Sequence, residues 1–163
     1  MTVYLLDSNV FIEAARRYYA FDLAPKFWEA LLLNADLGQI RSIDRVKHEL
    51  ERGNDQLASW AREAFAEACA STDDTAVTRS FAEIMNWVQT QEQFSNAAKA
   101  NFARGADGWL VAYARVHGCI LVTHEVLDLN TRRQVPIPNV CLGFGVPFID
   151  TFEMLRALGI RFV

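Results

Sequence analysis

Four acidic residues stand where an α/β fold could bring their carboxylates together. They are Asp7 at the end of the first apolar run, Glu49 in Val46-Lys-His-Glu-Leu50, Asp107 after Gly105-Ala, and Glu125 at the end of Leu121-Val-Thr-His-Glu. Open parallel sheets bind ligands at the carboxyl ends of their strands. Carboxylates gathered there would repel one another unless a cation lay between them, and oxygen ligands alone select Mg²⁺ or Mn²⁺. The pattern therefore predicts a metal-dependent phosphoryl-transfer site.

Each of these acids also has an ordinary structural role open to it. Asp7 can form the turn after its strand, and Asp107 can cap the start of a helix or complement the helix dipole. Glu49 and its neighbour Glu51 can both be solvated on a helix surface. Glu125 can be a plain loop acid. Four such acids beside apolar elements favour a shared site over four independent accidents.

The elements that would carry these acids alternate between strand and helix. Apolar runs predict buried strands at residues 3–6, 40–43, 119–122 and 139–142, and a short edge strand at 160–163. Helical spacing predicts helices at about 10–19, 25–34, 44–53, 57–68, 77–88, 94–102, 107–117 and 151–158, with Asp44 as an N-cap. Residues 127–139 contain Pro136 and Pro138 and are expected to form a loop. This alternation predicts an α/β sandwich around a parallel sheet.

The composition is ordinary for a globular domain. The chain has 163 residues, 52% of them hydrophobic, and a formal net charge of −4. One domain over residues 1–163 is expected, with a helical segment at about 55–103. No apolar run reaches the about 18 residues of a membrane span, and no basic leader precedes the first strand, so we expect a cytoplasmic protein with no membrane partner. Cys69, Cys119 and Cys141 suggest neither a zinc site nor a disulfide framework.

Four segments of the chain resemble the ordered motifs of PIN-domain nucleases. In chain order they are Leu5-Leu-Asp-Ser-Asn9, the helix-borne Glu49, Ala106-Asp-Gly-Trp-Leu110 and Val122-Thr-His-Glu125. The runs 137–141 and 152–160 further resemble a bacterial PIN-like family of unknown function. The resemblance implies a three-layer α/β/α sandwich with a central parallel sheet of four to five strands. The fourth motif usually ends in Asp, so Glu125 is a departure that would change the metal geometry.

The same resemblance implies a reaction and a role for individual residues. The expected activity is a Mg²⁺- or Mn²⁺-dependent endoribonuclease that directs water at an RNA phosphodiester. The expected catalytic and metal-binding residues are Asp7, Asp107, Glu125 and Glu49, the last as a ligand or as the base that orients water. Hydrogen-bonding support is expected from Ser8, Asn9 and Thr123. Weaker candidates for RNA contacts are Arg16, Arg17, His124, Arg132 and Arg133.

Two other functions compete with the nuclease. A catalytically inactive PIN-like module that binds RNA or a protein would keep the fold without the chemistry. A phosphatase with Asp7 as its nucleophile is disfavoured, because Asn9 stands where that chemistry generally needs a second acid. Many small bacterial PIN proteins are VapC-like toxin ribonucleases of toxin–antitoxin pairs. The resemblance therefore implies RNA as the substrate, and a cognate antitoxin and a homodimer as protein partners.

Overall fold

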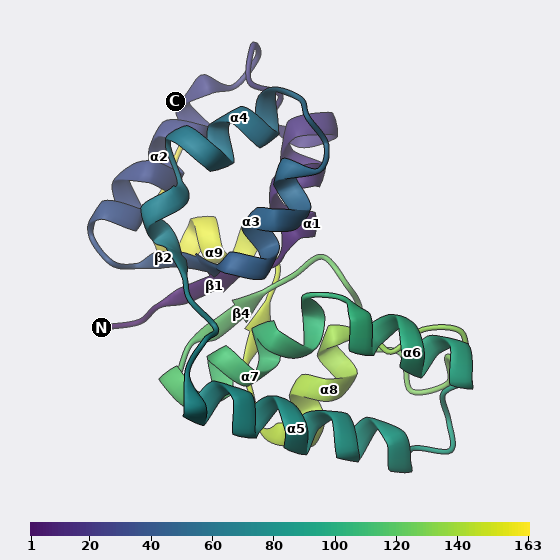
Figure 1. Cartoon of the computed structure of the whole chain (residues 1–163). Helices are drawn as coiled ribbons and strands as arrows, with labels where there is room; N and C mark the ends of the chain where they lie inside the picture. Colours follow the sequence, from purple (N-terminus) through teal and green to yellow (C-terminus); the bar gives the residue numbers. More distant parts are fainter.

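Five short parallel strands form the centre of the computed structural model, which describes residues 1–163 (Figure 1). They are β1 (Tyr4–Leu6), β2 (Ile40–Ile43), β3 (Cys69–Ala70), β4 (Ile120–Val122) and β5 (Phe148–Ile149). Their order is β3-β2-β1-β4-β5, and every neighbouring pair is parallel. The chain thus builds outward from β1 to β3 and then returns to add β4 and β5 on the other side. Sheets of this kind form a ligand crevice where the order reverses, here between β1 and β4.

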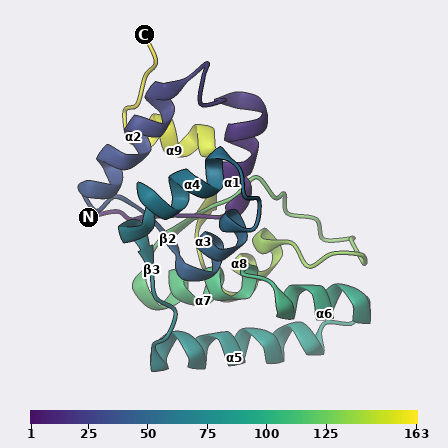
Figure 2. The same cartoon turned by 45° about the horizontal axis from the view of Figure 1, so that its top comes forward.

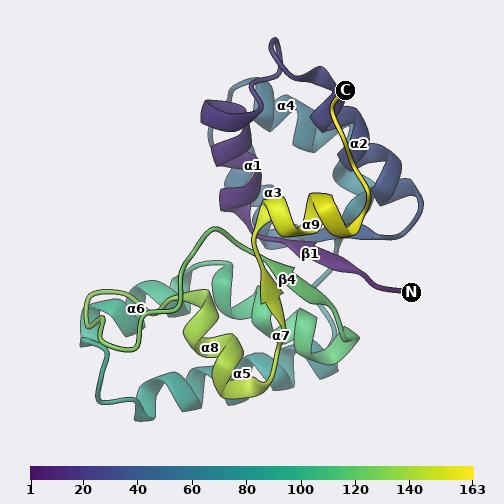
Figure 3. The ribbon, with the colours of Figure 1, turned by 180° about the vertical axis from the view of Figure 1, so that it is seen from behind.

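Helices cover both faces of this sheet. They are α1 (Ser8–Glu13), the π-helix η1 (Ala14–Tyr18), α2 (Pro25–Asp36), α3 (Asp44–Glu51), α4 (Gln56–Glu63), the 3₁₀-helix η2 (Ala66–Ala68), α5 (Thr75–Thr90), α6 (Asn96–Arg104), α7 (Asp107–His117), α8 (Ile137–Phe144) and α9 (Thr151–Ala157). Figures 1 and 3 show α1–α4 and α9 on one side of the strands and α5–α8 on the other, and Figure 2 shows α5 and α6 at the opposite end of the view from α2. None of the helices combines the length and the apolar character that a membrane span requires.

The two helical layers explain why the central strands are apolar throughout. Leu5, Leu6, Leu121 and Val122 are fully buried and belong to one cluster of 38 buried apolar residues. Strands covered on both faces lose the alternation of apolar and polar residues that half-exposed strands show. The predicted α/β sandwich with a parallel sheet of four to five strands is therefore confirmed. The strands predicted at 3–6, 40–43 and 119–122 correspond to β1, β2 and β4.

Two predicted strands are wrong. Residues 139–142 lie inside α8, because Pro138 suits the first turn of a helix and the apolar residues of this segment bury one helical face. The loop predicted at 127–139 consequently ends where α8 begins, at Ile137. Residues 160–163 form no strand. Instead the ring of Phe162 lies 5.5 Å from that of Tyr19 and 6.3 Å from that of Phe27, so the C-terminal segment packs beside α2 (Figure 3).

The helical segment expected at about 55–103 is interrupted. The helix predicted at 57–68 ends as α4 at Glu63, and η2 and the unpredicted strand β3 follow it. The break lets Phe65 turn into the core, where its ring stacks on Trp60 at 4.9 Å. Asp44 was expected as an N-cap, but it occupies the first helical position of α3, and Ile43 is the cap residue. Strand β5, which has two residues, was also not predicted.

Candidate active site

Asp7 ends β1 at the crevice, and its side chain is almost completely buried. Its backbone N–H donates to the carbonyl of Val122 at 3.0 Å, which continues the pairing of β1 with β4. The carboxylate Oδ2 accepts a hydrogen bond of 3.0 Å from the Thr123 hydroxyl, and Oδ1 accepts a longer one of 3.4 Å from Ser8. The Thr123 hydroxyl also accepts from the Glu125 N–H at 3.1 Å. Thr123 therefore links the ends of the two strands and orients the Asp7 carboxylate.

Glu49 and Asp107 reach the crevice from opposite helical layers. The Glu49 Oε1 accepts a hydrogen bond of 3.3 Å from the backbone N–H of Ala106, the residue before α7. The neighbouring Glu51 instead pairs with Lys47 on its own helix. Asp107 opens α7, yet no side-chain cap is formed there and no protein group donates to its carboxylate. The structure thus brings Glu49, and not Glu51, beside Asp107, and it leaves the Asp107 carboxylate without a partner from the chain.

Glu125 lies on the loop after β4 and is held by the segment that enters α8. Its Oε1 accepts a hydrogen bond of 3.0 Å from the Ile137 N–H and one of 3.4 Å from the Gln134 side chain. The Ile137 N–H is one of the free donors at the start of a helix, where partial positive charge stabilises a carboxylate. The Glu125 carboxylate therefore ties the start of this loop to its end, at Gln134 and Ile137.

The four carboxylates share one electrostatic environment. Burial raises the pKa of Asp7 to about 7, helped by the negative charges of Glu125 and Glu49 and opposed by hydrogen bonds from Thr123 and Ser8. Burial also raises the pKa of Asp107 to about 8, and the charges of Asp7, Glu125 and Glu49 add to this shift. The pKa of Glu125 rises because of burial, although its bonds to Ile137 and Gln134 lower it. Asp7 and Asp107 thus lie close enough to the other acids for those charges to disfavour their ionised forms.

No basic side chain neutralises this group of acids. The ion pairs of the chain join Arg17 to Glu13, Lys47 to Glu51, Arg115 to Glu83 and His117 to Asp74. No lysine, arginine or histidine is among the causes of the pKa shifts of Asp7, Asp107 or Glu125. Buried carboxylates without a cation are costly, because the charged form loses its solvation and gains no compensating charge.

The donor chemistry of these residues suits a hard divalent cation. In this structure no three His, Cys, Asp or Glu side chains are grouped closely enough to hold a metal ion. The acids nevertheless offer only oxygen donors, and the Asp107 carboxylate receives no hydrogen bond from the chain. Oxygen-only ligation favours Mg²⁺, Mn²⁺ or Ca²⁺ over softer metals. Asp7, Asp107, Glu125 and Glu49 are the residues that would hold such an ion.

A cavity of about 340 Å³ beside the acids is lined in part by Thr123, His124 and Glu125. Two further cavities flank the acids. One of about 330 Å³ is lined by Asn9, Glu13, Tyr18, His124 and Glu125. The other, of about 290 Å³, is lined by Ala98, Asn101, Phe102, Asp107, Arg133, Gln134 and Val135. Each contains one of the four acids, and Gln134, which lines the second, donates to Glu125, which lines the first. A strand of substrate could therefore extend from one cavity to the other past the carboxylates.

The chain resembles a known protein family in sequence and a solved structure in fold. A family model described as a domain of unknown function (DUF4411) matches residues 4–162. The chain belongs to this family. No curated protein sequence matches it. A chain of the crystal structure of VapBC2 from Rickettsia felis bound to a DNA fragment from their promoter superposes with a TM-score of 0.55, at 15% sequence identity, over 91% of this chain and 98% of that chain. This likeness confirms a PIN-like fold for the DUF4411 protein.

The remaining predicted residues of this DUF4411 protein are divided between the crevice and the outer surface. Ser8, Asn9, Thr123 and His124 lie at the crevice, and the Nε2 atom of His124 is 2.8 Å from the Thr151 hydroxyl. Arg133 shares a cavity with Asp107 without forming an ion pair. The exposed Arg16, Arg17 and Arg132 line neither cavity, and Arg17 pairs with Glu13.

Sequence reasoning missed several residues that line the two cavities. They are Glu13, Tyr18, Asn101 and Gln134. Glu13 and Tyr18 lie on α1 and η1, directly after the first motif, so their nearness to Asp7 in sequence was a usable signal. No spacing or composition marked Asn101 or Gln134, which only the tertiary fold brings to the acids.

Proposed function

We propose that this protein is a metal-dependent endoribonuclease, built as one PIN-like domain over residues 1–163. The observation that carries the proposal is the group of Asp7, Glu49, Asp107 and Glu125, in which Asp7, Asp107 and Glu125 are desolvated and no member pairs with a basic side chain. Such a group destabilises the fold unless a bound ligand offsets the repulsion between the carboxylates. Groups with perturbed pKa values cluster at functional sites. The PIN-like fold and the four matching motifs favour RNA hydrolysis as that function.

The chain's own residues would orient the reaction. When bound, a Mg²⁺ or Mn²⁺ ion supplies Lewis-acid activation of water and stabilises the phosphodiester in the transition state. Thr123 holds the Asp7 carboxylate through its hydroxyl, and the Ala106 N–H orients Glu49. Glu125 is fixed by the start of α8. The raised pKa of Asp107 and of Asp7 means that both must lose a proton before they can bind a cation near neutral pH.

The biological setting follows from the same resemblance. The solved structure with the similar fold is a VapBC2 assembly with a promoter DNA fragment. By analogy, we assign this chain a cytoplasmic role as the toxin of a toxin–antitoxin pair, with a cognate antitoxin and a homodimer as partners. Co-purification from its own cells, followed by mass spectrometry, is expected to yield a small partner encoded next to it. Growth unaffected by overexpression of the chain alone would contradict the toxin role.

A second candidate is an inactive PIN-like module that binds RNA or a protein. The observation in its favour is that no three acids are grouped closely enough to hold a metal, and that Glu125 is already engaged by Ile137 and Gln134. Such a module would retain the fold and its cavities without cleaving RNA.

Cleavage of labelled RNA separates the two candidates. Wild type and the Asp7→Asn variant would be incubated with RNA and Mg²⁺ or Mn²⁺, with EDTA as the metal-free reaction. The matched control is Asp36→Asn, since Asp36 is exposed at the end of α2 and makes no side-chain hydrogen bond. We expect metal-dependent cleavage by wild type and Asp36→Asn and its loss in Asp7→Asn. Equal products from wild type and Asp7→Asn would remove the nuclease assignment.

A further inference from the structure

We propose that Tyr18 and His124 form a stacking subsite for one nucleobase of single-stranded RNA, next to the four acids. This inference rests on the proposed function and names a part of the substrate that the acids themselves cannot bind. Tyr18 and His124 line the same cavity as Glu125, one of the four acids. Tyr18 is 53% exposed, so its ring is open to a ligand that enters this cavity. A base bound there would lie beside the phosphodiester presented to the carboxylates.

The aromatic side chains of this subsite are held in place by the fold. The Tyr18 ring meets Phe152 of α9 edge-on at 5.5 Å, and the His124 ring lies 6.1 Å from Tyr18 and 6.2 Å from Phe152. The Nε2 atom of His124 is 2.8 Å from the Thr151 hydroxyl, which fixes the imidazole. Three rings from separate elements thus support one another while Tyr18 stays open to solvent. A preorganised ring loses little conformational freedom when a base stacks on it.

The backbone points Tyr18 outward at the cost of a regular helix. Tyr18 ends the π-helix η1, and the N–H of Tyr19 donates to the carbonyl of Ala14 at 2.8 Å. The next side chain, Tyr19, is partly buried and packs against the core, where it stacks on Phe27 at 4.4 Å. π-Helical turns are rare and are found frequently at functional sites. The turn therefore packs Tyr19 against the core and presents Tyr18 at the cavity.

The charges around the cavity favour a base over a phosphate. Glu13 and Glu125 line it, so an anionic phosphate would be repelled there, whereas a neutral base would not. The Asn9 side chain makes no hydrogen bond within the protein, so its amide is free to donate to and accept from a base edge. The exposed Arg17, which pairs with Glu13 at 3.5 Å, is available for the adjoining backbone phosphate. Aromatic stacking with a polar rim is the usual way in which proteins hold unpaired bases.

The binding test uses a chain that does not cleave. In the Asp7→Asn background, fluorescence anisotropy with a labelled single-stranded RNA and Mg²⁺ gives a Kd for Tyr18→Ala, Tyr18→Phe and the control Leu33→Ala. Leu33 is 60% exposed on α2 and lines neither cavity. We expect Tyr18→Ala to raise the Kd about 5- to 100-fold, the range of base–aromatic stacking, and Tyr18→Phe to restore most of the binding. Leu33→Ala is expected to bind like the parent.

Abasic substitution in the RNA distinguishes a loss of base stacking from other causes of weaker RNA binding. Replacing one nucleotide at a time by an abasic site should reveal a position where the parent loses affinity and Tyr18→Ala does not, because the base and the ring act on each other. Equal Kd values for the parent and Tyr18→Ala, or an abasic penalty that Tyr18→Ala leaves unchanged at every position, would overturn the subsite while cleavage by wild type still supports the nuclease. Absence of both RNA binding and cleavage would overturn the nuclease and the subsite together.

Discussion

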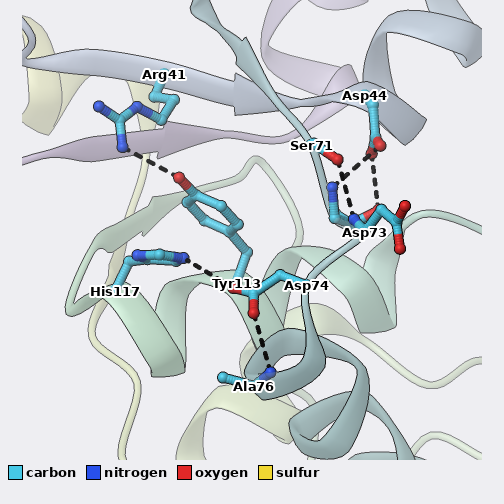
Figure 4. A network of polar contacts seen from close by, with 9 residues as sticks. Arg41, Asp44, Ser71, Asp73, Asp74, Ala76, Tyr113 and His117 are labelled. Carbon is cyan, nitrogen blue, oxygen red and sulfur yellow. Dashed lines mark hydrogen bonds and ion pairs between the residues drawn. The ribbon is translucent and has the colours of Figure 1, made fainter.

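Asp7 and Asp44 follow neighbouring strands of one sheet, yet their carboxylates have opposite surroundings. Asp44, after β2, accepts hydrogen bonds from the N–H groups of Arg45 at 2.8 Å and Thr72 at 3.0 Å, and from the Thr72 hydroxyl at 2.9 Å. Figure 4 shows it joined in this way to the segment that leads into α5. Asp7, after β1, has one short bond from Thr123 and a longer one from Ser8.

The difference extends to the charges around each acid. Beside Asp44, Arg45 donates to the Thr72 hydroxyl at 3.1 Å and its guanidinium lies 3.9 Å from the centre of the Trp109 ring. In the same region Arg41 donates to the Tyr113 hydroxyl, and His117 lies near Asp74 (Figure 4). Around Asp7 the neighbouring charges are Glu125 and Glu49. A carboxylate that is hydrogen-bonded by the chain stabilises the fold. A carboxylate whose nearest charges are other carboxylates is destabilised in its ionised form unless a cation binds beside it.

The largest effect should separate the unneutralised acids, represented by Asp107, from Asp44 by the rate of RNA cleavage. Asp107→Asn removes a carboxylate of the unneutralised group, and we expect RNA cleavage to fall at least about 100-fold, since each 1.4 kcal/mol of transition-state stabilisation is worth tenfold. Asp44→Asn should retain cleavage within about threefold under conditions where it is folded. Single-turnover rates with excess enzyme measure both. A large loss of RNA cleavage in Asp44→Asn, with an intact circular dichroism spectrum, would contradict the distinction between Asp44 and the unneutralised acids.

The unneutralised acids should make the free energy of unfolding depend on pH. The pKa values of Asp7 and Asp107 are raised to about 7 and about 8, so the folded state keeps protons that the unfolded chain has already lost. Unfolding free energy in EDTA should therefore fall by about 3 kcal/mol for each of the two acids as pH rises from about 5 to about 8. Urea titrations measure the fall, and Asp7→Asn should reduce it. Excess Mg²⁺ should restore stability at high pH. A flat or rising profile in EDTA would show that these carboxylates are not desolvated together.

The satisfied acid should show its role in stability. Asp44→Ala leaves the Thr72 N–H without its acceptor, and we expect about 2–3 kcal/mol of destabilisation from urea midpoints. Asp73→Ala is the matched control, because Asp73 is exposed and its carboxylate accepts no hydrogen bond. Its effect should stay within about 0.5 kcal/mol. Similar losses in the two variants would deny Asp44 its structural role.

The smallest effect concerns Thr123, which makes the shorter of the two side-chain hydrogen bonds to Asp7. Thr123→Val removes the hydroxyl that donates to Asp7 and accepts from the Glu125 N–H, and cleavage should fall about tenfold. Thr123→Ser keeps a hydroxyl and should recover most of the rate. Steady-state kinetics should place the loss in kcat, because Thr123 is only 2% exposed and acts through the Asp7 carboxylate to which it donates. A change confined to KM would assign Thr123 to substrate binding.

Much of the fold was predictable because burial on both faces leaves a clear trace in sequence. Continuous apolar runs marked β1, β2 and β4, and the helix before Gly118 ended as expected at a residue with φ of 68°. The run at 139–142 was misread because a short stretch with three apolar residues fits a buried strand or a buried helix equally well. Strands β3 and β5 have two residues each and were too short to leave a pattern.

The residues of the candidate site could be named from the sequence, but their tertiary contacts could not. The placement of Asp7 and Glu125 after strands and of Asp107 at a helix start follows from local pattern. That Glu49 reaches Ala106 while Glu51 pairs with Lys47 depends on how α3 packs, which one helix does not reveal. The outward direction of Tyr18 depends on the π-helical turn, which has no recognised sequence signal here.

Calorimetric titration with Mn²⁺ tests the central claim directly, without depending on any RNA. The account predicts that wild type and Asp36→Asn bind Mn²⁺ near neutral pH and release protons as they do so, because Asp7 and Asp107 must ionise to serve as ligands. Asp107→Asn should bind at least about tenfold more weakly and release fewer protons. Equal affinity and equal proton release in wild type and Asp107→Asn would contradict a shared cation site at these four acids.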